Sequence, residues 1–185
     1  MKLYTEARSP YGRKVRMLLR EIGLASEVTE IAVEGPLDPA VAALNPVIRV
    51  PVLVRADGRA LYDSRVITRY LDELAGGGFY PAGRLWDVLS QEAAIEGIIQ
   101  SANAADGLEG AQKARITNAL DMFEHDWAEI AGRSWDMSLI GMACALAHLD
   151  DRHGACGWRD GRPRLASWFA GVESRPSFVA TAYPA

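Results

Sequence analysis

The stretch KLYTEARSPYGRKVRMLLREIG, residues 2–23, decides how the chain begins to fold. Residues 2–5 favour a short β-strand. The pair Ser9-Pro10 then favours a helix start, because Ser is a preferred N-cap and Pro is favoured at the first helical position. The apolar side chains that follow recur at the spacing of one buried helix face: Val15, Leu18, Leu19 and Ile22. Gly23 predicts the end of this helix.

Strand and helix signals continue to alternate up to residue 75. The sequence predicts three further strands, at residues 27–33, 52–54 and 60–62, and a turn-rich break at residues 34–39. Asp57-Gly58 is a strong β-hairpin signal between the last two strands. Asp63-Ser64 then starts a helix with one apolar side: Val66, Ile67, Tyr70, Leu71 and Leu74. The order β-α-β, an excursion, then β-β-α indicates a layered α/β domain.

The second half of the chain is predicted to be helical. Three consecutive glycines, residues 76–78, give the strongest linker signal. We therefore expect an α/β domain over residues 1–75, a linker over residues 76–84 and an all-helical domain over residues 85–185. Apolar spacing predicts helices that begin near Leu85, cover residues 116–130, cover residues 137–149 and begin at Pro163. Residues 137–149 are apolar almost all round and belong at the centre, and helical spacing also places Trp168 and Phe169 in the core.

Composition narrows the class of protein. The chain has 185 residues, a net charge of −4, and 49% hydrophobic and 24% charged residues, which is typical of a globular protein. No basic run indicates a nucleic-acid or anionic-membrane partner. The first residues lack the apolar core of a signal peptide, and residues 137–149 are too short to span a bilayer. Cys144 and Cys156 are too few for a disulfide framework, so we expect a reducing, cytoplasmic setting.

Ser9 combines a structural role with a chemical one. As a cap it satisfies the first N–H groups of a helix, and the local pattern alone favours this interpretation. As a functional group, its hydroxyl can hydrogen-bond a ligand thiolate beside the partial positive charge of the helix N-terminus. Both effects lower the pKa of a bound thiol.

Two other pairs have the same double character. Val50-Pro51 precedes a strand, where Pro cannot donate to a ladder. A cis bond here is expected in only about 5% of cases, but it would turn the Val50 N–H and C=O outward, toward an extended peptide ligand. Asp63-Ser64 can cap its helix, or accept from an α-amino group and hold a carboxylate. All three pairs belong at one end of the sheet, where they can hold a thiol, a backbone and an amino-acid head group, as a glutathione cradle does.

At these residues the chain resembles the cytosolic glutathione S-transferases, particularly bacterial members whose N-terminus runs S-P-[YF]-x-R-K-[VL]. The matching segments are SPYGRKVRMLLRE (9–21), NPVIRVPVLV (45–54), DGRALYDSRVITRYLDE (57–73), MACALAHLD (142–150) and SWFAGVESRPSFVAT (167–181). The resemblance implies a thioredoxin-like α/β domain of order β-α-β-α-β-β-α, followed by an all-α domain. It also implies that Ser9 activates the thiol, Val50-Pro51 binds the cysteinyl backbone and Asp63-Ser64 holds the γ-glutamyl group.

The family implies further contacts and partners. Arg49 matches a basic position near the glycyl end of glutathione, and Tyr11 lies close enough to Ser9 to touch the ligand. Tyr4 and Tyr11 are alternative thiol activators, although Tyr4 is expected to point into the sheet packing. The resemblance implies glutathione as co-substrate, a small hydrophobic electrophile, a homodimer and a role in detoxification, with no metal.

Four features depart from the family pattern. Asp63 stands where the family more often has Glu, and Ile48 where it usually has Gly before the basic residue. At the family's capping box of the central helix, Asp136 can still cap, but Leu139 cannot return a hydrogen bond. The stretch from residue 84 to residue 132 is short for two long helices, which predicts a trimmed helical domain.

The leading hypothesis is therefore an enzyme that binds glutathione and activates its thiol for attack on an electrophile. The alternative is a non-catalytic glutathione-binding or protein-interaction module on the same fold. A glutaredoxin-like exchanger is disfavoured, because a Ser9 hydroxyl cannot form a mixed disulfide. A zinc site can be drawn from four side chains, but no motif spacing supports it: Cys144, His148, His153 and Cys156.

Overall fold

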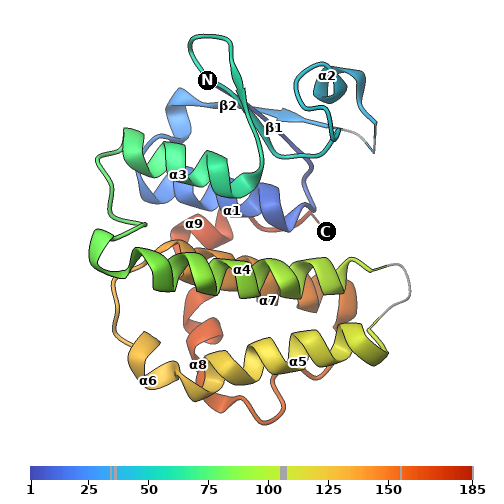
Figure 1. The fold of residues 1–185 in the computed structure, drawn as a ribbon, viewed down its shortest axis with the longest axis vertical. Coiled ribbons are helices and arrows are strands. Elements are labelled where there is room, and N and C mark those ends of the chain that lie inside the picture. Colours follow the sequence, from blue (N-terminus) through green and yellow to red (C-terminus); the bar gives the residue numbers. More distant parts are fainter. Residues whose placement is uncertain (34, 36, 105–107, 155, 185) are drawn as a thin grey trace. The chain divides into compact units, whose positions relative to one another are not determined.

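A computed structural model describes residues 1–33, 35, 37–104, 108–154 and 156–184. The chain forms two compact units (Figure 1). Unit 1 consists of Met1–Tyr80 together with the C-terminal segment that begins at Ala180, and unit 2 is Pro81–Val179. Each unit is described by itself below. The α/β unit followed by a helical unit confirms the predicted fold class.

Unit 1 is built on a four-stranded sheet. Its elements are β1 (Lys2–Thr5), α1 (Pro10–Glu21), the 3-10 turn η1 (Ala25–Glu27), β2 (Thr29–Ala32), α2 (Pro39–Ala42), β3 (Val52–Val54), β4 (Ala60–Leu61) and α3 (Ser64–Leu74). The strand order is β2-β1-β3-β4, with β2 parallel to β1 and the other two pairs antiparallel. Along the chain, these strands and α-helices follow the predicted order β-α-β-α-β-β-α. Residues 34 and 36 of the predicted break lie outside the described residues.

The two faces of the sheet have separate cores. Helices α1 and α3 lie together on one face (Figure 1), and fully buried side chains such as Leu3, Leu18 and Leu71 fill that layer. Each such side chain contributes about 1.5–3 kcal/mol on burial. A smaller cluster of Val33, Val41 and Val52 forms a second packed core, with Tyr4, Leu44, Ile48, Val50 and Ala60 packed against it.

The local signals of unit 1 explain its turns and its exposed helix face. Gly58 adopts a positive φ of 83° in the β3–β4 hairpin, as the Asp57-Gly58 signal predicts. The predicted apolar side of α3 is only partly buried, since Ile67 and Leu71 are fully buried but Val66 and Leu74 are 46% and 51% exposed. The predicted apolar side of α3 is therefore buried only in part, and Val66 and Leu74 leave apolar surface exposed on this helix.

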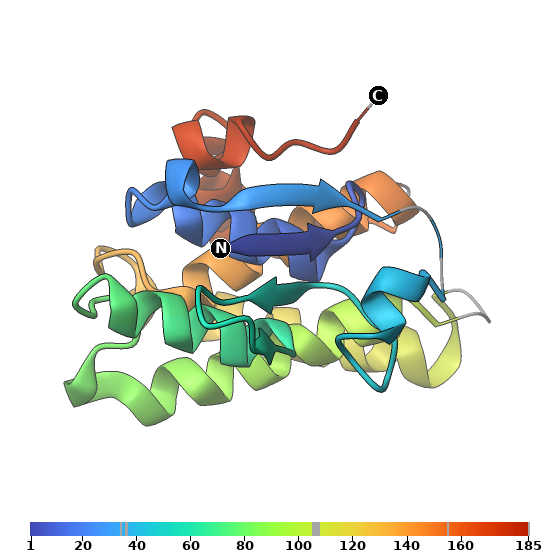
Figure 2. The ribbon, with the colours of Figure 1, turned by 90° about the horizontal axis from the view of Figure 1, so that it is seen from above.

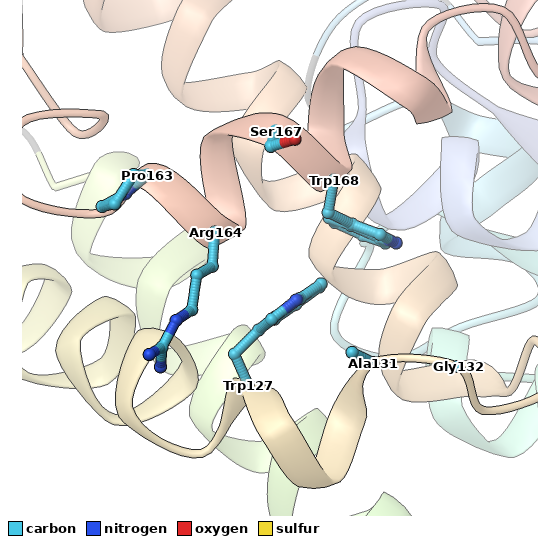
Figure 3. A pocket seen from close by; sticks show the side chains of 7 residues that line it. All are labelled: Trp127, Ala131, Gly132, Pro163, Arg164, Ser167 and Trp168. Atoms are coloured by element: carbon cyan, nitrogen blue, oxygen red, sulfur yellow. The ribbon is translucent and has the colours of Figure 1, made fainter.

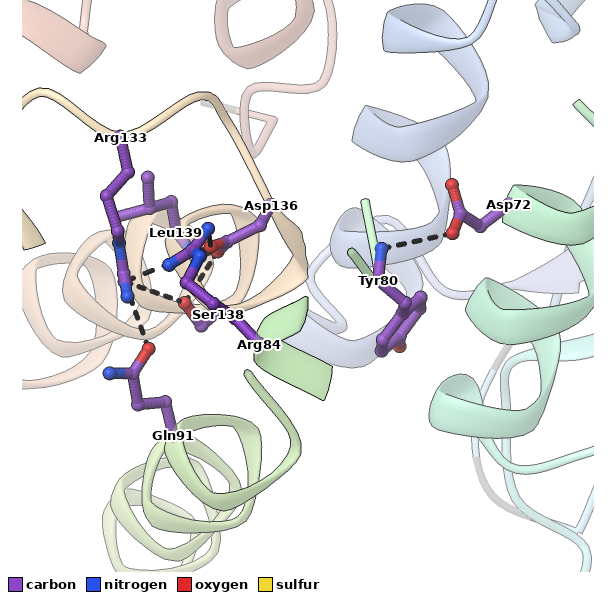
Figure 4. Close-up of polar contacts among 8 residues, drawn as sticks. All are labelled: Asp72, Tyr80, Arg84, Gln91, Arg133, Asp136, Ser138 and Leu139. Atoms are coloured by element: carbon purple, nitrogen blue, oxygen red, sulfur yellow. Dashed lines mark hydrogen bonds and ion pairs between the residues drawn. The ribbon is translucent and has the colours of Figure 1, made fainter. Parts of the chain in front are cut away.

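Asp72 fixes the chain where it leaves α3. Its carboxylate accepts from the Phe79 N–H at 2.9 Å. It also accepts from the Tyr80 N–H at 3.0 Å, the bond drawn in Figure 4. Between them, the three glycines at residues 76–78 all have positive φ, which glycine adopts at little steric cost. The Tyr80 hydroxyl also lies 2.7 Å from the Thr68 hydroxyl. The residues that follow the three glycines, Phe79 and Tyr80, are thus bound to α3.

A second segment joins unit 1 from the far end of the sequence. The Arg13 guanidinium lies 4.7 Å from the centre of the Tyr183 ring, and its Nε lies 3.5 Å from the Thr181 hydroxyl. Arg8 donates to the Pro184 carbonyl at 2.7 Å. Arg13 is only 2% exposed. Residues 181–184 therefore form a tail that covers the first turns of α1.

All the regular secondary structure in the described residues of unit 2 is helical. Its elements are η2 (Ala82–Arg84), α4 (Leu85–Ala102), α5 (Gly110–His125), α6 (Trp127–Ile130), α7 (Met137–His153), α8 (Pro163–Val172) and α9 (Pro176–Val179). Every residue of α7 from Met137 to Leu149 is buried, so this helix is central as predicted. The predicted helix over residues 116–130 is wrong in one respect, because the chain breaks at Asp126 and forms two helices, α5 and α6.

Asp136 organises the start of α7 (Figure 4). It is 1% exposed, and its Oδ1 accepts from the Leu139 N–H at 3.1 Å and from the Ser138 hydroxyl at 2.6 Å. Arg84 lies 3.1 Å from its other oxygen, Oδ2. Asp136 therefore caps α7 as predicted, and the Arg84 guanidinium adds a charge-assisted contact to the capping carboxylate.

Candidate functional site

Three loops of unit 1 leave the sheet at the same end. The strand register pairs Tyr4 with Val52 and Leu53 with Leu61. The end of β1, the start of β3 and the end of β4 are therefore neighbours, and Figure 2 shows β3 running opposite to β1. The loops that adjoin these strand ends carry the predicted pairs Ser9-Pro10, Val50-Pro51 and Asp63-Ser64.

Ser9 is the N-cap of α1. Its Oγ accepts a hydrogen bond from the Gly12 N–H at 3.1 Å, and the residue is 8% exposed. A serine hydroxyl has one donor hydrogen besides its two acceptor positions, so capping does not use the donor. Gly12 is required by the packing, because a Cβ there would overlap the Thr5 hydroxyl. The cap interpretation is confirmed, and it leaves the O–H available to a ligand.

The two tyrosines near Ser9 differ in their surroundings. Tyr4 packs against the valine cluster of the sheet, as expected, and so points away from a role as thiol activator. Tyr11 is half-buried and lies in the first turn of α1, two residues after Ser9.

Val50 and Pro51 are joined by a cis peptide bond. The Val50 side chain packs against the valine cluster, which fixes this residue from the side. Within the part of the chain that the structure describes, its N–H and C=O make no hydrogen bond. Both backbone groups are therefore available for pairing with an extended ligand, as a strand edge is.

Asn45 shapes the loop before Val50, a role the sequence did not reveal. It is 2% exposed, its Nδ2 donates to the Arg49 carbonyl at 2.8 Å, and its Oδ1 accepts from the Val47 N–H at 3.1 Å. Ile48 within the loop has a φ of +50°. Arg49 is exposed, and its guanidinium has no hydrogen bond or ion pair with the described residues. An Asn-Pro pair signals a turn, but only the fold shows what the side chain holds.

Asp63 and Ser64 begin α3. The Asp63 carboxylate caps the helix by accepting from the Arg65 N–H at 3.0 Å, and it remains 61% exposed. Its peptide bond with Tyr62 is cis. Ser64 is 2% exposed, and no described residue hydrogen-bonds its hydroxyl. A free hydroxyl at a helix N-terminus can hold a carboxylate, since the helix dipole adds to the attraction.

A hollow on unit 2 is a separate surface feature. Its volume is about 540 Å³, and Figure 3 shows Trp127 and Trp168 beside it. The two indole rings lie 5.5 Å apart at 59°. Phe169 is in the core as predicted, but the same expectation for Trp168 was wrong, because that ring is half-buried and lines the hollow. No residue predicted to contact glutathione lines it.

The four side chains considered for zinc have other surroundings. Cys144 is fully buried in α7, His148 Nε2 lies 3.0 Å from Asn103 Oδ1, and His153 Nε2 lies 2.8 Å from the Ala102 carbonyl. Burial, with Arg152 nearby, lowers the pKa of His148 from 6.5 to about 4. Among the residues described, no cluster of three or more His, Cys, Asp or Glu side chains is arranged to hold a metal ion. Nor is any helix there long and apolar enough to cross a membrane.

Comparison with known proteins matches this geometry. A model of the glutathione S-transferase N-terminal domain covers residues 3–78. The uncharacterized GST-like protein YibF of Escherichia coli strain K12 is 31% identical, across 100% of this chain and 99% of its own length. The maleylacetoacetate isomerase of Pseudomonas aeruginosa is 33% identical, across 90% of this chain and 76% of its own.

A solved structure extends the match to three dimensions. A glutathione transferase family member from Pseudomonas fluorescens Pf-5, crystallised with bound glutathione, superimposes with a TM-score of 0.91. It is 34% identical and covers 100% of this chain and 99% of its own. The thioredoxin-like sheet, its helical partner unit and these relatives define one class of proteins. This chain belongs to the glutathione S-transferase family.

Proposed function

We propose that this chain binds glutathione at the loop end of the unit 1 sheet and activates its thiol for attack on a small electrophile. The observation that carries the proposal is a set of polar groups at one sheet end without partners among the described residues: the Val50 backbone, the Ser64 hydroxyl and the Arg49 guanidinium. These groups match the parts of a tripeptide with two carboxylates. The Val50 backbone can pair with the peptide backbone, and the Ser64 hydroxyl and the Arg49 guanidinium can each donate to one carboxylate.

In this proposal each part of glutathione has its own contact. The cysteinyl backbone pairs with the N–H and C=O of Val50, which the cis bond to Pro51 presents. The γ-glutamyl carboxylate accepts from the Ser64 hydroxyl and the first N–H groups of α3, and Asp63 accepts from the α-amino group. Arg49 attracts the glycyl carboxylate.

Ser9 then acts on the thiol. Its O–H donates to the sulfur while its Oγ continues to cap α1. One hydrogen bond to a charged group contributes about 1.5–3 kcal/mol, which lowers a thiol pKa by roughly one to two units. The thiolate attacks an electrophilic carbon, and Tyr11 lies near enough in sequence to border that ligand. Because one relative is named as an isomerase, isomerisation belongs among the reactions to test.

Calorimetry with glutathione is the first experiment. Ser64→Ala should weaken binding about tenfold, because one charge-assisted hydrogen bond is lost. Ser26→Ala, at an exposed serine of the same unit, should leave the affinity unchanged. Equal binding by the wild type and Ser64→Ala would remove Ser64 from the site.

The thiol-activating role of Ser9 needs its own readout. Ser9→Ala should keep glutathione affinity within about threefold and raise the pKa of the bound thiol by roughly one to two units. Thiolate absorbance measured against pH reports that shift directly. Ser9→Thr retains both the hydroxyl and the helix cap, so it should keep the wild-type pKa. Ser9→Gly costs a helix cap only a few tenths of a kcal/mol but has no hydroxyl, so a raised thiol pKa in that variant separates thiol activation from loss of the cap.

A non-catalytic binder is the second candidate function. The Asp63 carboxylate already accepts from the Arg65 backbone and lies 3.5 Å from the Arg65 guanidinium, which weakens its availability to substrate. Glutathione binding without turnover of electrophiles, peroxides or isomerisable substrates would favour this function. In either case we place the protein in the reducing cytoplasm, where glutathione is abundant.

A homodimer also belongs to the proposal. Tyr62, Val66 and Leu74 are 39%, 46% and 51% exposed on and beside α3, which leaves an apolar stripe on unit 1. Such stripes are typical of protein interfaces. Light scattering should give twice the chain mass for the wild type and a monomer for Val66→Glu.

A further inference from the structure

A second hollow in unit 2 carries charge as well as apolar surface. Its volume is about 250 Å³, and it lies between α5 and the segment that joins α7 to α8. Its apolar lining comes from Leu108, Ile116, Leu120 and Trp158, and its polar lining from Lys113, Thr117, Cys156 and Arg162. All of these residues belong to unit 2, so this cavity is distinct from the sheet end of unit 1.

The apolar wall of the cavity is formed by buried side chains. Ile116, Leu120 and Trp158 are 5%, 1% and 4% exposed. The Trp158 indole donates to Asp150 Oδ1 at 2.7 Å, which fixes the ring in place. A preformed apolar wall with a few polar groups is the usual architecture of a small-molecule site.

The polar side of the cavity is positively charged. The buried Arg162 pairs with Asp121 at 2.6 Å, which offsets its charge. Its Nε–H is nevertheless buried without an acceptor among the described residues. Lys113 is exposed, and its ammonium makes no hydrogen bond or ion pair with the described part of the chain. Among the described residues, the Lys113 ammonium is therefore a positive charge at the cavity without an ion-pair partner.

We propose that this cavity binds a small organic anion that joins a carboxylate to an aromatic ring or a short aliphatic chain. The apolar end contacts Trp158, Leu120 and Ile116, and the carboxylate pairs with Lys113. The volume limits the ligand to a single ring or a short chain, well below the size of glutathione. The site is thus a second ligand site that operates independently of the proposed glutathione site.

The thiol of Cys156 offers a local reporter. Cys156 lines the cavity and is half-buried, whereas Cys144 is fully buried in α7. A disulfide reagent such as dithionitrobenzoate should therefore react first at Cys156 in the folded chain, and Cys156→Ser should abolish that reaction. A ligand in the cavity should slow the labelling.

The test compares 3-phenylpropanoate with its uncharged amide. The acid should slow the labelling of Cys156 and the amide should not. Lys113→Gln should weaken binding of the acid on the order of tenfold, because a charge-assisted pair is lost. Arg115→Gln on the same helix is the matched control: this arginine is exposed, lies outside the cavity lining and bonds Gln112, so its removal should leave the affinity unchanged.

The outcomes separate cleanly. Equal protection by the acid and the amide, or equal affinity in Lys113→Gln and the wild type, would overturn the anion preference. Calorimetry of the acid on Cys156→Ser provides a readout that needs no label. Absence of both heat and protection at millimolar acid would overturn the site, whatever the result of the glutathione titration.

Discussion

Ile48 holds a backbone conformation that most side chains avoid. Its φ of +50° lies in the left-handed region, which costs an L-residue roughly 1–2 kcal/mol. Its side chain packs against the cluster of Val33, Val41 and Val52, and this burial offsets the cost. The family pattern usually has Gly at this position, and the backbone angle now supplies the reason. Ile48 therefore adds packing to the loop at a position whose backbone angle suits Gly.

Substitutions at Ile48 should reverse the usual ranking of Ala and Gly. Both substitutions lose the packing of the Ile48 side chain. Ile48→Ala keeps the steric cost of the positive φ, whereas Ile48→Gly removes that cost. Urea titration should find Ile48→Gly more stable than Ile48→Ala by about 1 kcal/mol. In the middle of a helix or strand, a Gly variant is less stable than an Ala variant by about 0.5–1 kcal/mol. If Ile48→Gly were likewise less stable than Ile48→Ala, the loop would not adopt the left-handed conformation.

Single residues of the candidate site were predictable to different degrees. The Ser9 and Asp63 caps follow from short-range patterns, because a cap and its helix adjoin in sequence. The cis state of Val50-Pro51 does not, since local sequence gives it only about a 5% frequency. The part played by Asn45 depends on a carbonyl four residues away in a turn, which only the folded loop reveals.

His148 joins two helices of unit 2. It lies in α7, and its Nε2 meets Asn103 at the end of α4. Its pKa is lowered to about 4 by burial, below its ordinary value of 6.5. The unfolded chain therefore binds this proton more tightly than the folded chain does. The stability due to neutral His148 is complete above pH 6.5, falls as the pH drops toward 4, and changes little below that.

Without this histidine, the free energy of unfolding should fall less as the pH drops from 6.5 to 4. A shift of this size corresponds to about 3 kcal/mol between pH 6.5 and pH 4. His148→Gln keeps a hydrogen-bonding side chain but does not titrate, so the difference in unfolding free energy from wild type should change by that amount across the window. His125→Gln, at an exposed position on α5, is the control. Parallel curves for the wild type and His148→Gln would contradict the assignment.

Most elements followed from apolar periodicity, and the exceptions have physical causes. The helix predicted over residues 116–130 is interrupted at Asp126, yet Phe123, Trp127 and Ile130 keep their helical spacing. Periodicity detects which face is buried and does not detect a break that leaves that face aligned. Apolar spacing likewise does not predict the exposure of Val66 and Leu74, because that exposure depends on which residues pack against this side of α3.

At the scale of the whole molecule, unit 1 consists of two stretches far apart in sequence. Sequence patterns predict boundaries at composition changes such as the three glycines, and the boundaries at residues 75 and 85 stay predictions. The tail contacts of Arg13 and Arg8 join residues more than a hundred positions apart. Local pattern carries no signal for such pairing.

Removing the tail should loosen α1. A chain stopped after Val179 loses the Tyr183 ring over Arg13 and the bond from Arg8, together worth about 2 kcal/mol. All five tryptophans lie within unit 2, so their fluorescence does not report on this change. Amide hydrogen exchange in α1 does, and it should accelerate in the shortened chain and in Tyr183→Ala. Val179→Ala, at a residue 57% exposed, should leave that exchange unchanged.

The tail also gives unit 1 an order of assembly during translation. The sheet and its helices leave the ribosome first, but the face of α1 around Arg13 stays uncovered until the helical unit has been synthesised and residues 181–184 follow it. A chain that stalls within the helical unit therefore presents an α/β domain with one open flank.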